Sequence, residues 1–336
     1  MADLKKMKNN GRGYRSKEFL KRKKNIAKEL KKMKNYKLKQ TNKIDLVYTW
    51  GGVMNEMNQR NRYNYELQYS LRSAYKYLPW LNKIYILINS DTQYPYWLKE
   101  DLDKIVVVDR CTLFTNPSNC PTYNTFAVFA VAHRIPDLSN KFILIDDDVF
   151  FNRPLSPDYF FTENGLPAVY EARIPMLVYP DNEYKDFDFP EMKWAKCSHK
   201  AKPMRKDLIK KFNELYLGYS EHVQSHKYRY KGLSEELSMI YYEFLNQNTF
   251  IESRPHQEAE FLQILHSHPD DIQQEFEDIY DALQSKQFKT FNCNDDFSTE
   301  EDVYQKQRKV LWNFFNKLYP QAPSFEKINP DHEWYS

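Results

Sequence analysis

Apolar residues follow two distinct patterns in the first half of the chain. Four short segments rich in apolar, β-branched and aromatic residues are typical of strands; they are residues 44–50, 83–88, 105–108 and 142–145. The last of them is an unbroken apolar run, which is typical of a strand buried on both faces of a sheet. Two segments between them, residues 62–77 and 126–133, carry apolar side chains at helical spacing. Strands that alternate with helices indicate βαβ units with right-handed crossovers. We therefore predict an α/β fold with a mainly parallel, Rossmann-like sheet.

The alternation stops after residue 154. Residues 155–200 are rich in Pro, Tyr and acidic residues, and we expect them to be irregular. Helical periodicity then returns in four segments, which are residues 206–219, 234–246, 271–287 and 299–319. The last of these has one apolar stripe along its length, which indicates packing against a core. The second half of the chain is therefore predicted to be a mostly helical part.

Three consecutive carboxylates, Asp146, Asp147 and Asp148, follow the fourth predicted strand. In an open parallel sheet, ligands bind beyond the carboxyl ends of the strands. Adjacent carboxylates repel one another unless a cation or hydrogen-bond donors compensate them. Magnesium is often held by one or two carboxylates together with the phosphates of its substrate. This Asp triplet therefore predicts a metal-assisted site for a phosphate-bearing substrate, with a solvated acidic turn as the alternative.

Composition and charge narrow the possible functions. The 336 residues include only 7 Gly, and no glycine-rich phosphate-binding motif is present, so any nucleotide must be held in another way. Residues 1–43 carry 17 Lys and Arg against 3 Asp and Glu; because the whole chain has a net charge of +3, the remainder is acidic. We expect the basic arm to be a solvated helix or a disordered segment, or else a tether to anionic lipid, nucleic acid or a partner. The acidic body argues against specific nucleic-acid binding.

The cysteines and the hydropathy pattern suggest a cytoplasmic protein. Four cysteines are widely spread without a C-x-x-C pair, so we expect reduced thiols; they are Cys111, Cys120, Cys197 and Cys293. No apolar run is long enough to span a membrane, and no apolar segment typical of a signal peptide follows the basic start. The expected location is cytoplasmic, with the basic arm as a candidate peripheral contact to a membrane.

Several blocks, taken in order, resemble the Stealth family of sugar-phosphate transferases, which includes bacterial capsule polymerases. The blocks are residues 44–50, 62–73 with 79–80, 121–154, a weaker pair at 199–203 and 225–229, and 291–296 with 320–326. The resemblance spans residues 44–326. It implies a nucleotide-sugar core (44–160), a mostly helical part that completes the site (161–326) and a short tail (327–336).

The resemblance implies transfer of a hexose 1-phosphate from a UDP-sugar to a hydroxyl of a glycan acceptor, with a phosphodiester product and release of UMP. It also implies Mg²⁺ or Mn²⁺ on Asp147, Asp148 and Asp295. A cation such as Arg229 can neutralise phosphate in a bidentate manner, and His199 is the candidate base or phosphate-contacting acid. Without the resemblance, His199 reads as a solvated loop residue, and Asp295 as a helix N-cap.

Four further residues in the blocks are candidates for substrate binding, and two have an explicit structural alternative; the four are Asn64, Arg72, Asn124 and His133. Arg72 could equally form a structural ion pair. His133 lies in an apolar helix, where a hydrogen-bonded core histidine is an equal alternative.

The chain departs from the family pattern in two places. Trp50 is followed by Gly51 and Gly52, where the family usually carries Val-Asp. The family's Asn-Asp-Asp is here a triplet of Asp, whose extra charge could compensate in part for the missing acid. Two alternatives therefore stay open. One is a GT-A-type glycosyltransferase that releases UDP, and the other is a sugar-nucleotide-binding protein without turnover.

Overall fold

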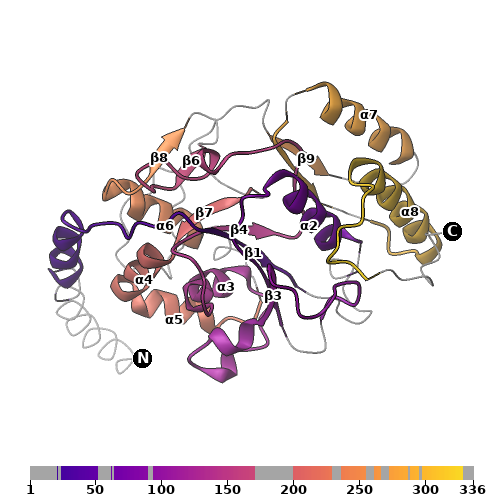
Figure 1. Cartoon of the computed structure of the whole chain (residues 1–336). Coiled ribbons are helices and arrows are strands. Elements are labelled where there is room, and N and C mark those ends of the chain that lie inside the picture. The colour runs from indigo at the N-terminus through magenta and orange to yellow at the C-terminus, as the bar shows by residue number, and fades with distance from the viewer. Residues whose placement is uncertain are drawn as a thin grey trace, which may run out of the picture.

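The fold is seen in a computed structural model of the chain (Figure 1). The structure describes residues 21, 24–51, 62, 64–89, 94–170, 200–228, 236–254, 261–265, 272–286, 288–294 and 297–327.

A five-stranded sheet in the order β3-β2-β1-β4-β7 forms the centre of the molecule. Its strands are β1 (Ile44–Thr49), β2 (Ile84–Ile88), β3 (Ile105–Asp109), β4 (Lys141–Asp146) and β7 (Lys202–Arg205). The first four strands are parallel, and β7 runs antiparallel beside β4. The chain extends from β1 to β2 and β3 on one side and reaches β4 on the other. The predicted mainly parallel α/β sheet is confirmed, and its topological switch point lies between β1 and β4.

Helices cover both faces of this sheet (Figure 1). On one face, strand residues such as Val47 and Phe142 pack with α3 (Thr125–Val131), α4 (Lys206–Leu215), α5 (Leu217–Ser225) and α6 (Glu236–Gln247). On the other face, α2 (Glu66–Tyr77) packs against strand residues such as Leu46 and Ile143. Because both faces are covered, the strands are apolar without alternation, which is why they could be recognised in the sequence.

A second, three-stranded sheet joins the core to the C-terminal helices. It consists of β5 (Val149–Phe151), β10 (Thr290–Asn294) and β9 (Phe261–Leu265), with β10 in the middle. Phe150 of β5 stacks on Phe291 and on Phe315, with ring centroids 4.9 Å and 4.7 Å apart. Phe315 belongs to α8 (Glu301–Leu318), and α7 (Ile272–Ser285) packs on the same cluster. The helical C-terminal part is confirmed, and the apolar stripe of its last helix lies in the core as predicted.

Three predictions about individual segments need correction. The predicted helix 206–219 is two helices, α4 and α5, with Tyr216 between them in a non-helical conformation. The segment 155–200 is not wholly irregular, because β6 (Ala168–Tyr170) pairs with β8 (Glu252–Arg254); residues 171–199 lie outside the described residues. In the basic arm, residues 24–33 are helical, and Ile26 and Met33 are buried against the body. That helix is therefore packed on one side rather than fully solvated.

The expectation of reduced thiols is wrong for two cysteines. Cys111 and Cys120 form a disulfide across the loop that follows β3. Two short helical turns, η3 (Arg110–Leu113) and η4 (Pro117–Asn119), fold this loop back and bring the two Cα atoms within 5.4 Å. The scattered spacing could not reveal this, because pairing depends on the path of the loop. Cys293 is a buried free thiol, and Cys197 lies outside the described residues.

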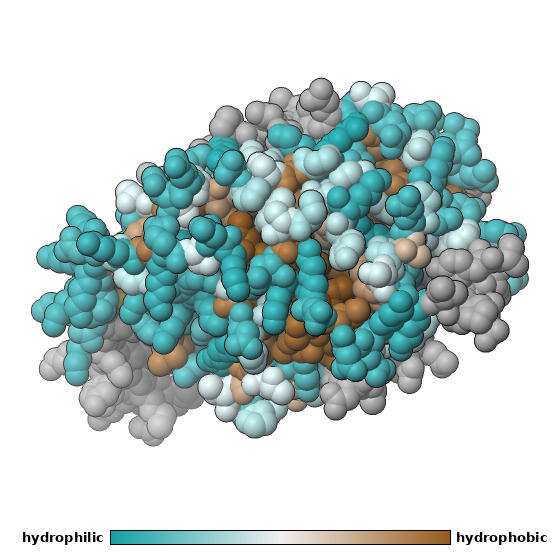
Figure 2. Space-filling model, in the orientation of Figure 1, coloured by the Kyte–Doolittle hydropathy of each residue, from teal (hydrophilic) through white to brown (hydrophobic). Residues whose placement is uncertain are grey.

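The surface of the described part is mainly polar. Figure 2 shows hydrophilic side chains over most of one face, with apolar residues visible between them near its centre. No helix in the part of the chain that the structure describes is long and apolar enough to cross a membrane.

Candidate active site

The Asp triplet lies in the turn between β4 and β5, at the carboxyl edge of the sheet. Asp146 ends β4 beside Thr49 of β1, whose hydroxyl donates to Asp146 Oδ1 at 2.7 Å. Lys202 Nζ on β7 donates to Asp146 Oδ2 at 3.2 Å. A hydrogen-bond donor and a positive charge therefore compensate the carboxylate of Asp146, the first of the three. Asp147 and Asp148 follow in the turn, and both are half-buried.

Strand β10 runs directly past this turn. Cys293 N donates to the carbonyl oxygen of Asp148 at 2.9 Å, and Asn292 lies opposite Val149 in the register of β10 with β5. The side chain of Asn292 is 0% exposed, and neither its amide oxygen nor its amide nitrogen has a hydrogen-bond partner within the described ranges. Such a buried amide is uncommon, because it forfeits its hydrogen bonds with water. The strand that precedes Asp295 in sequence thus places an unsatisfied polar group next to the strand that follows the triplet.

Arg110, which the sequence did not single out, connects the ends of the three neighbouring strands. Its guanidinium is buried and donates to Asn89 Oδ1 at 3.1 Å, Trp50 O at 3.1 Å and Thr122 O at 2.6 Å. Burial lowers the pKa of Arg110 to about 10, and nearby groups, Asp147 among them, act against that change. The side chain therefore stays charged at neutral pH. An arginine directly after a predicted strand is the signal that could have pointed to it.

Asp147 also influences the neighbouring strand β1. The hydroxyl of Tyr48 lies 3.0 Å from Ser70 Oγ, and burial raises the pKa of Tyr48, with a further contribution from the charge of Asp147. The same carboxylate thus acts on a group of β1 and on the cation that follows β3. Asp147 belongs to the carboxyl edge where the switch point predicts a ligand.

A comparison with known families identifies this region of the chain. Residues 60–169 match the sequence model of Stealth protein CR2, conserved region 2. The match supports the resemblance of the chain to the Stealth family. The matched range includes β2, β3 and β4 together with the whole Asp triplet, so the carboxyl edge of the sheet is largely a Stealth conserved region.

The named relatives are phosphotransferases of polysaccharides. An exopolysaccharide phosphotransferase of Streptomyces coelicolor is 26% identical over 287 residues, which cover 78% of this chain and 49% of that protein. A capsular polysaccharide phosphotransferase of Haemophilus influenzae is 34% identical over 148 residues, which cover 38% of this chain and 40% of that protein. The chain thus spans half or less of the length of these relatives.

A solved structure of a galactosyltransferase gives a weaker match. The structure of LgtC in complex with donor and acceptor sugar analogues aligns with 83% of this chain and 98% of its own, at 10% identity and a TM-score of 0.43. A likeness at this level carries no inference about function.

Two of the predicted substrate-binding residues in the Stealth blocks contact the C-terminal part. Asn64 is buried, and its Oδ1 accepts a hydrogen bond from the hydroxyl of Tyr304 at 2.7 Å. Arg72 donates to both carboxylate oxygens of Glu326, at 2.6 Å and 2.7 Å, and to Tyr319 O at 2.9 Å. The structure thus shows the ion pair that was the alternative for Arg72. A role in substrate binding stays a prediction for both residues.

The other two predicted substrate-binding residues belong to α3 and the turn after it. Asn124 is the N-cap of α3, and its Nδ2 donates to Val223 O at 3.3 Å and His226 O at 3.2 Å. His133 Nδ1 lies 3.3 Å from Asn213 Nδ2, and burial lowers the pKa of His133 to about 4. His133 is therefore neutral at pH 7, as the core-histidine alternative requires, and its contact with substrate stays a prediction.

Three predicted catalytic or metal-binding residues, His199, Arg229 and Asp295, lie outside the described residues. Their roles stay predictions. The helix-cap alternative for Asp295 is wrong, because the N-cap position of α8 is Glu300. In the part of the chain that the structure describes, no group of three or more His, Cys, Asp and Glu side chains is arranged to hold a metal ion. The described residues supply two of the three predicted ligands, Asp147 and Asp148.

Proposed function

We propose that the chain transfers a hexose 1-phosphate from a UDP-sugar to a hydroxyl of a glycan acceptor. The observation that carries the proposal is the position of Asp147 and Asp148, at the switch point of a parallel sheet and within the Stealth conserved region. The names of the relatives, which are polysaccharide phosphotransferases, support this class of reaction. The acidic edge beside a buried arginine suits a phosphate-bearing substrate held through a cation.

The donor set fits Mg²⁺ or Mn²⁺. Asp147 and Asp148 offer hard carboxylate oxygens, and a metal of this kind completes its shell with substrate phosphates and water. Asp146 is less suited as a ligand, because Thr49 and Lys202 occupy its two oxygens. Asp295 remains the proposed third ligand. When bound, the metal would stabilise negative charge on the phosphate that is attacked.

In this reaction the acceptor hydroxyl oxygen attacks the phosphorus that carries the sugar. A new phosphorus–oxygen bond forms, and the anhydride bond to the second phosphate breaks, so that UMP leaves. The acceptor's proton goes to a base, for which His199 is the candidate. Arg229 would neutralise the phosphate charge through paired hydrogen bonds. The GT-A alternative differs in the bond that breaks, which is the bond between the sugar carbon and oxygen.

The released nucleotide distinguishes these possibilities. The purified chain is incubated with a panel of UDP-sugars, Mg²⁺ or Mn²⁺ and candidate glycan acceptors, and the nucleotide product is identified. UMP formed in step with a phosphodiester is the expected result. UDP would assign the chain to the glycosyltransferases. Neither product, despite binding of the donor, would favour the alternative without turnover, in which the missing first-block acid is decisive.

A pair of variants tests the metal site separately from folding. Asp148→Asn is expected to lower the rate by at least about a hundredfold without lowering the melting temperature, because it removes a ligand charge and keeps the shape. Asp146→Asn is the matched control. It should retain turnover, since its amide oxygen still accepts from Thr49 and Asp146 is not a proposed ligand. An active, folded Asp148→Asn protein would remove this residue from the proposed site.

A further inference from the structure

A stacked pair of aromatic rings, one exposed and one half-buried, lies beside the carboxyl edge of the sheet. Tyr123 and Tyr228 are stacked, with ring centroids 5.6 Å apart and an angle of 17° between the ring planes. Tyr228 is 59% exposed, the largest value among the exposed large apolar and aromatic side chains of the described residues. One face of the pair is therefore open to solvent, where an aromatic ring gains little from folding.

Backbone and side-chain hydrogen bonds hold the two rings in place. Tyr123 N donates to the carbonyl oxygen of Lys227 at 2.7 Å. Asn124, directly after Tyr123, donates to the carbonyl oxygen of His226 at 3.2 Å. These bonds join the loop after β3 to the segment after α5 next to the ring pair. The stacked rings are a preorganised surface, which a ligand meets without an ordering cost.

Positive charge accompanies the rings. Lys227 Nζ lies 5.7 Å from the centroid of Tyr123 and 5.7 Å from that of Tyr228. Arg110 Nη2 donates to Thr122 O, one residue before Tyr123. A cation next to an exposed aromatic face suits a ligand that combines a flat ring with an anionic group.

The position of the pair relates it to the proposed catalytic edge. Arg110 links the loop that carries Tyr123 to the ends of β1 and β2, through Trp50 O and Asn89 Oδ1. The charge of Asp147 acts on that same guanidinium. The rings therefore lie on the β3 side of the carboxyl edge, while the Asp triplet lies at the switch point. A nucleotide whose phosphates reach the triplet would extend along this edge.

We propose that Tyr228, with Tyr123 behind it, is the stacking surface for the uracil of the donor nucleotide, and that Lys227 pairs with the nucleotide's phosphates. This inference rests on the proposed UDP-sugar donor and assigns its nucleoside end. A neutral acceptor saccharide could also stack on an aromatic ring, but it would have no use for the adjacent ammonium group. The uracil assignment accounts for both the rings and the charge.

Calorimetric binding of UDP, UMP and uridine to the whole chain tests the assignment without requiring turnover. Tyr228→Ala should weaken binding of all three ligands by about tenfold or more, because it removes the stacking ring. Tyr228→Phe should bind like the parent protein, since it keeps the ring. Lys227→Gln should weaken UDP and UMP by about two- to fivefold and leave uridine unchanged, as expected for an exposed ion pair.

Tyr96→Ala is the control, because Tyr96 is also exposed, at 50%, and lies beside Trp97, which bonds to the C-terminal segment. Its UDP affinity should be unchanged. Unaltered UDP binding in a folded Tyr228→Ala protein would overturn the assignment, as would loss of acceptor-saccharide binding with UDP binding intact. If UDP binding depends on Tyr228 but the chain forms no UMP, only the proposed function would be overturned. UMP formation with an unchanged donor KM in Tyr228→Ala would overturn only this inference.

Discussion

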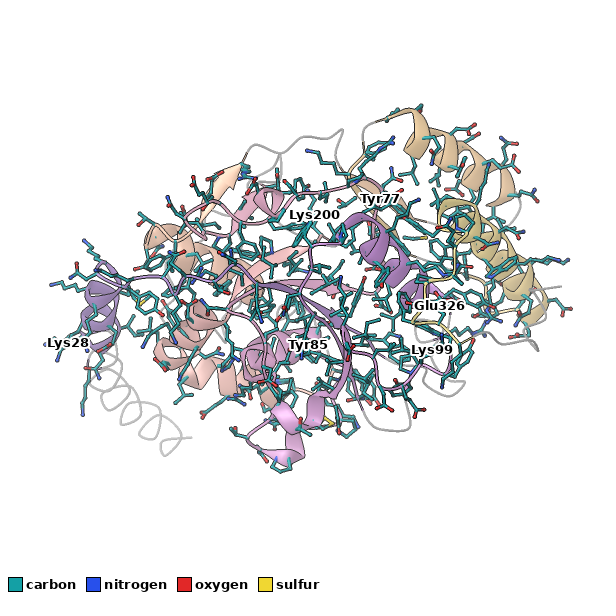
Figure 3. All side chains as sticks on the ribbon, in the orientation of Figure 1. Lys28, Tyr77, Tyr85, Lys99, Lys200 and Glu326 are labelled. Atoms are coloured by element: carbon teal, nitrogen blue, oxygen red, sulfur yellow. A yellow bond between two sulfur atoms is a disulfide. The ribbon has the colours of Figure 1, made fainter. Side chains whose placement is uncertain are left out.

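Removing the carboxylate of Glu326 should destabilise the whole fold, because that group neutralises a buried arginine. Arg72 on α2 and Glu326 in the C-terminal segment have side chains that are each 2% exposed. Gln68 Nε2 donates a further hydrogen bond to Glu326 Oε2 at 2.8 Å. Figure 3 shows Glu326 near Lys99, another residue that binds this segment, through the carbonyl oxygen of Ser324. The ion pair thus joins the central domain to the end of the described chain.

The size of the effect follows from what is left behind. In Glu326→Gln the guanidinium stays buried and retains the carbonyl oxygen of Tyr319, but it has lost the opposite charge that it faced. Removing one partner of a buried ion pair typically costs about 3–5 kcal/mol. The double variant Arg72→Met with Glu326→Leu leaves no charge in the interior. We expect it to lie within about 2 kcal/mol of the parent protein, with the lost hydrogen bonds of Gln68 and Tyr319 as the remaining cost.

Urea unfolding followed by tryptophan fluorescence and far-UV circular dichroism measures these free energies, provided that the two probes give coincident transitions. The exposed pair of Lys211 and Glu214, with side chains 41% and 49% exposed, supplies the control. Glu214→Gln should cost no more than about 0.5 kcal/mol. A loss below about 1 kcal/mol in Glu326→Gln would refute the reasoning, as would a double variant as unstable as the sum of the single ones.

Two further predictions concern pH and thiol chemistry. The folded state lowers the pKa of His133 to about 4 from an ordinary value of 6.5, so its contribution to stability is complete above pH 6.5 and is lost as the pH falls towards 4. This loss of unfolding free energy amounts to about 3 kcal/mol. The unfolding free energy of His133→Asn should therefore fall less steeply between pH 7 and pH 4 than that of the parent protein. Parallel curves for the two proteins would contradict the prediction. Replacing both Cys111 and Cys120 by Ser should lower the free energy of unfolding by about 2–3 kcal/mol, since their disulfide closes a short loop. Thiol titration of the denatured parent protein should find two more thiols after reduction than before. Equal thiol counts would exclude the disulfide.

The central sheet could be predicted because β1, β2 and β4 are largely buried on both faces, and because the half-buried edge strand β3 is also rich in apolar residues. Apolar and β-branched residues dominate β1, β2, β3 and β4, and the order of these strands along the chain implies the crossovers. β7 and β10 carry no such signal. β7 reads Lys-Pro-Met-Arg, and it is an edge strand, where a proline is tolerated. β10 reads Thr-Phe-Asn-Cys-Asn and pairs with β5, far away in the sequence. Strands of this kind are determined by their partners rather than by their own composition.

The candidate site was predictable to a similar extent. Adjacent carboxylates after a buried strand singled out the Asp triplet, which lies at the carboxyl edge of the sheet as expected, and its role in metal binding stays a prediction. Arg110 and Lys202 were not found, since each acts through contacts that depend on the arrangement of strands. A position within a Stealth-like block also did not show whether a residue has a structural role or binds substrate. Arg72 and Asn124 lie in such blocks, yet their visible contacts are an ion pair and a helix cap.

The contacts of Asp146 bear on the acid that is missing after Trp50. An additional carboxylate in the triplet could have compensated for that loss by serving as a further ligand. Its two oxygens instead face the hydroxyl of Thr49 and the ammonium group of Lys202, whose charge balances its own. For the proposed metal, the triplet would therefore offer the two carboxylates of Asp147 and Asp148, as many as the family's Asn-Asp-Asp would offer. We infer that the extra charge of Asp146 serves the junction of β1, β4 and β7 and does not replace the missing acid.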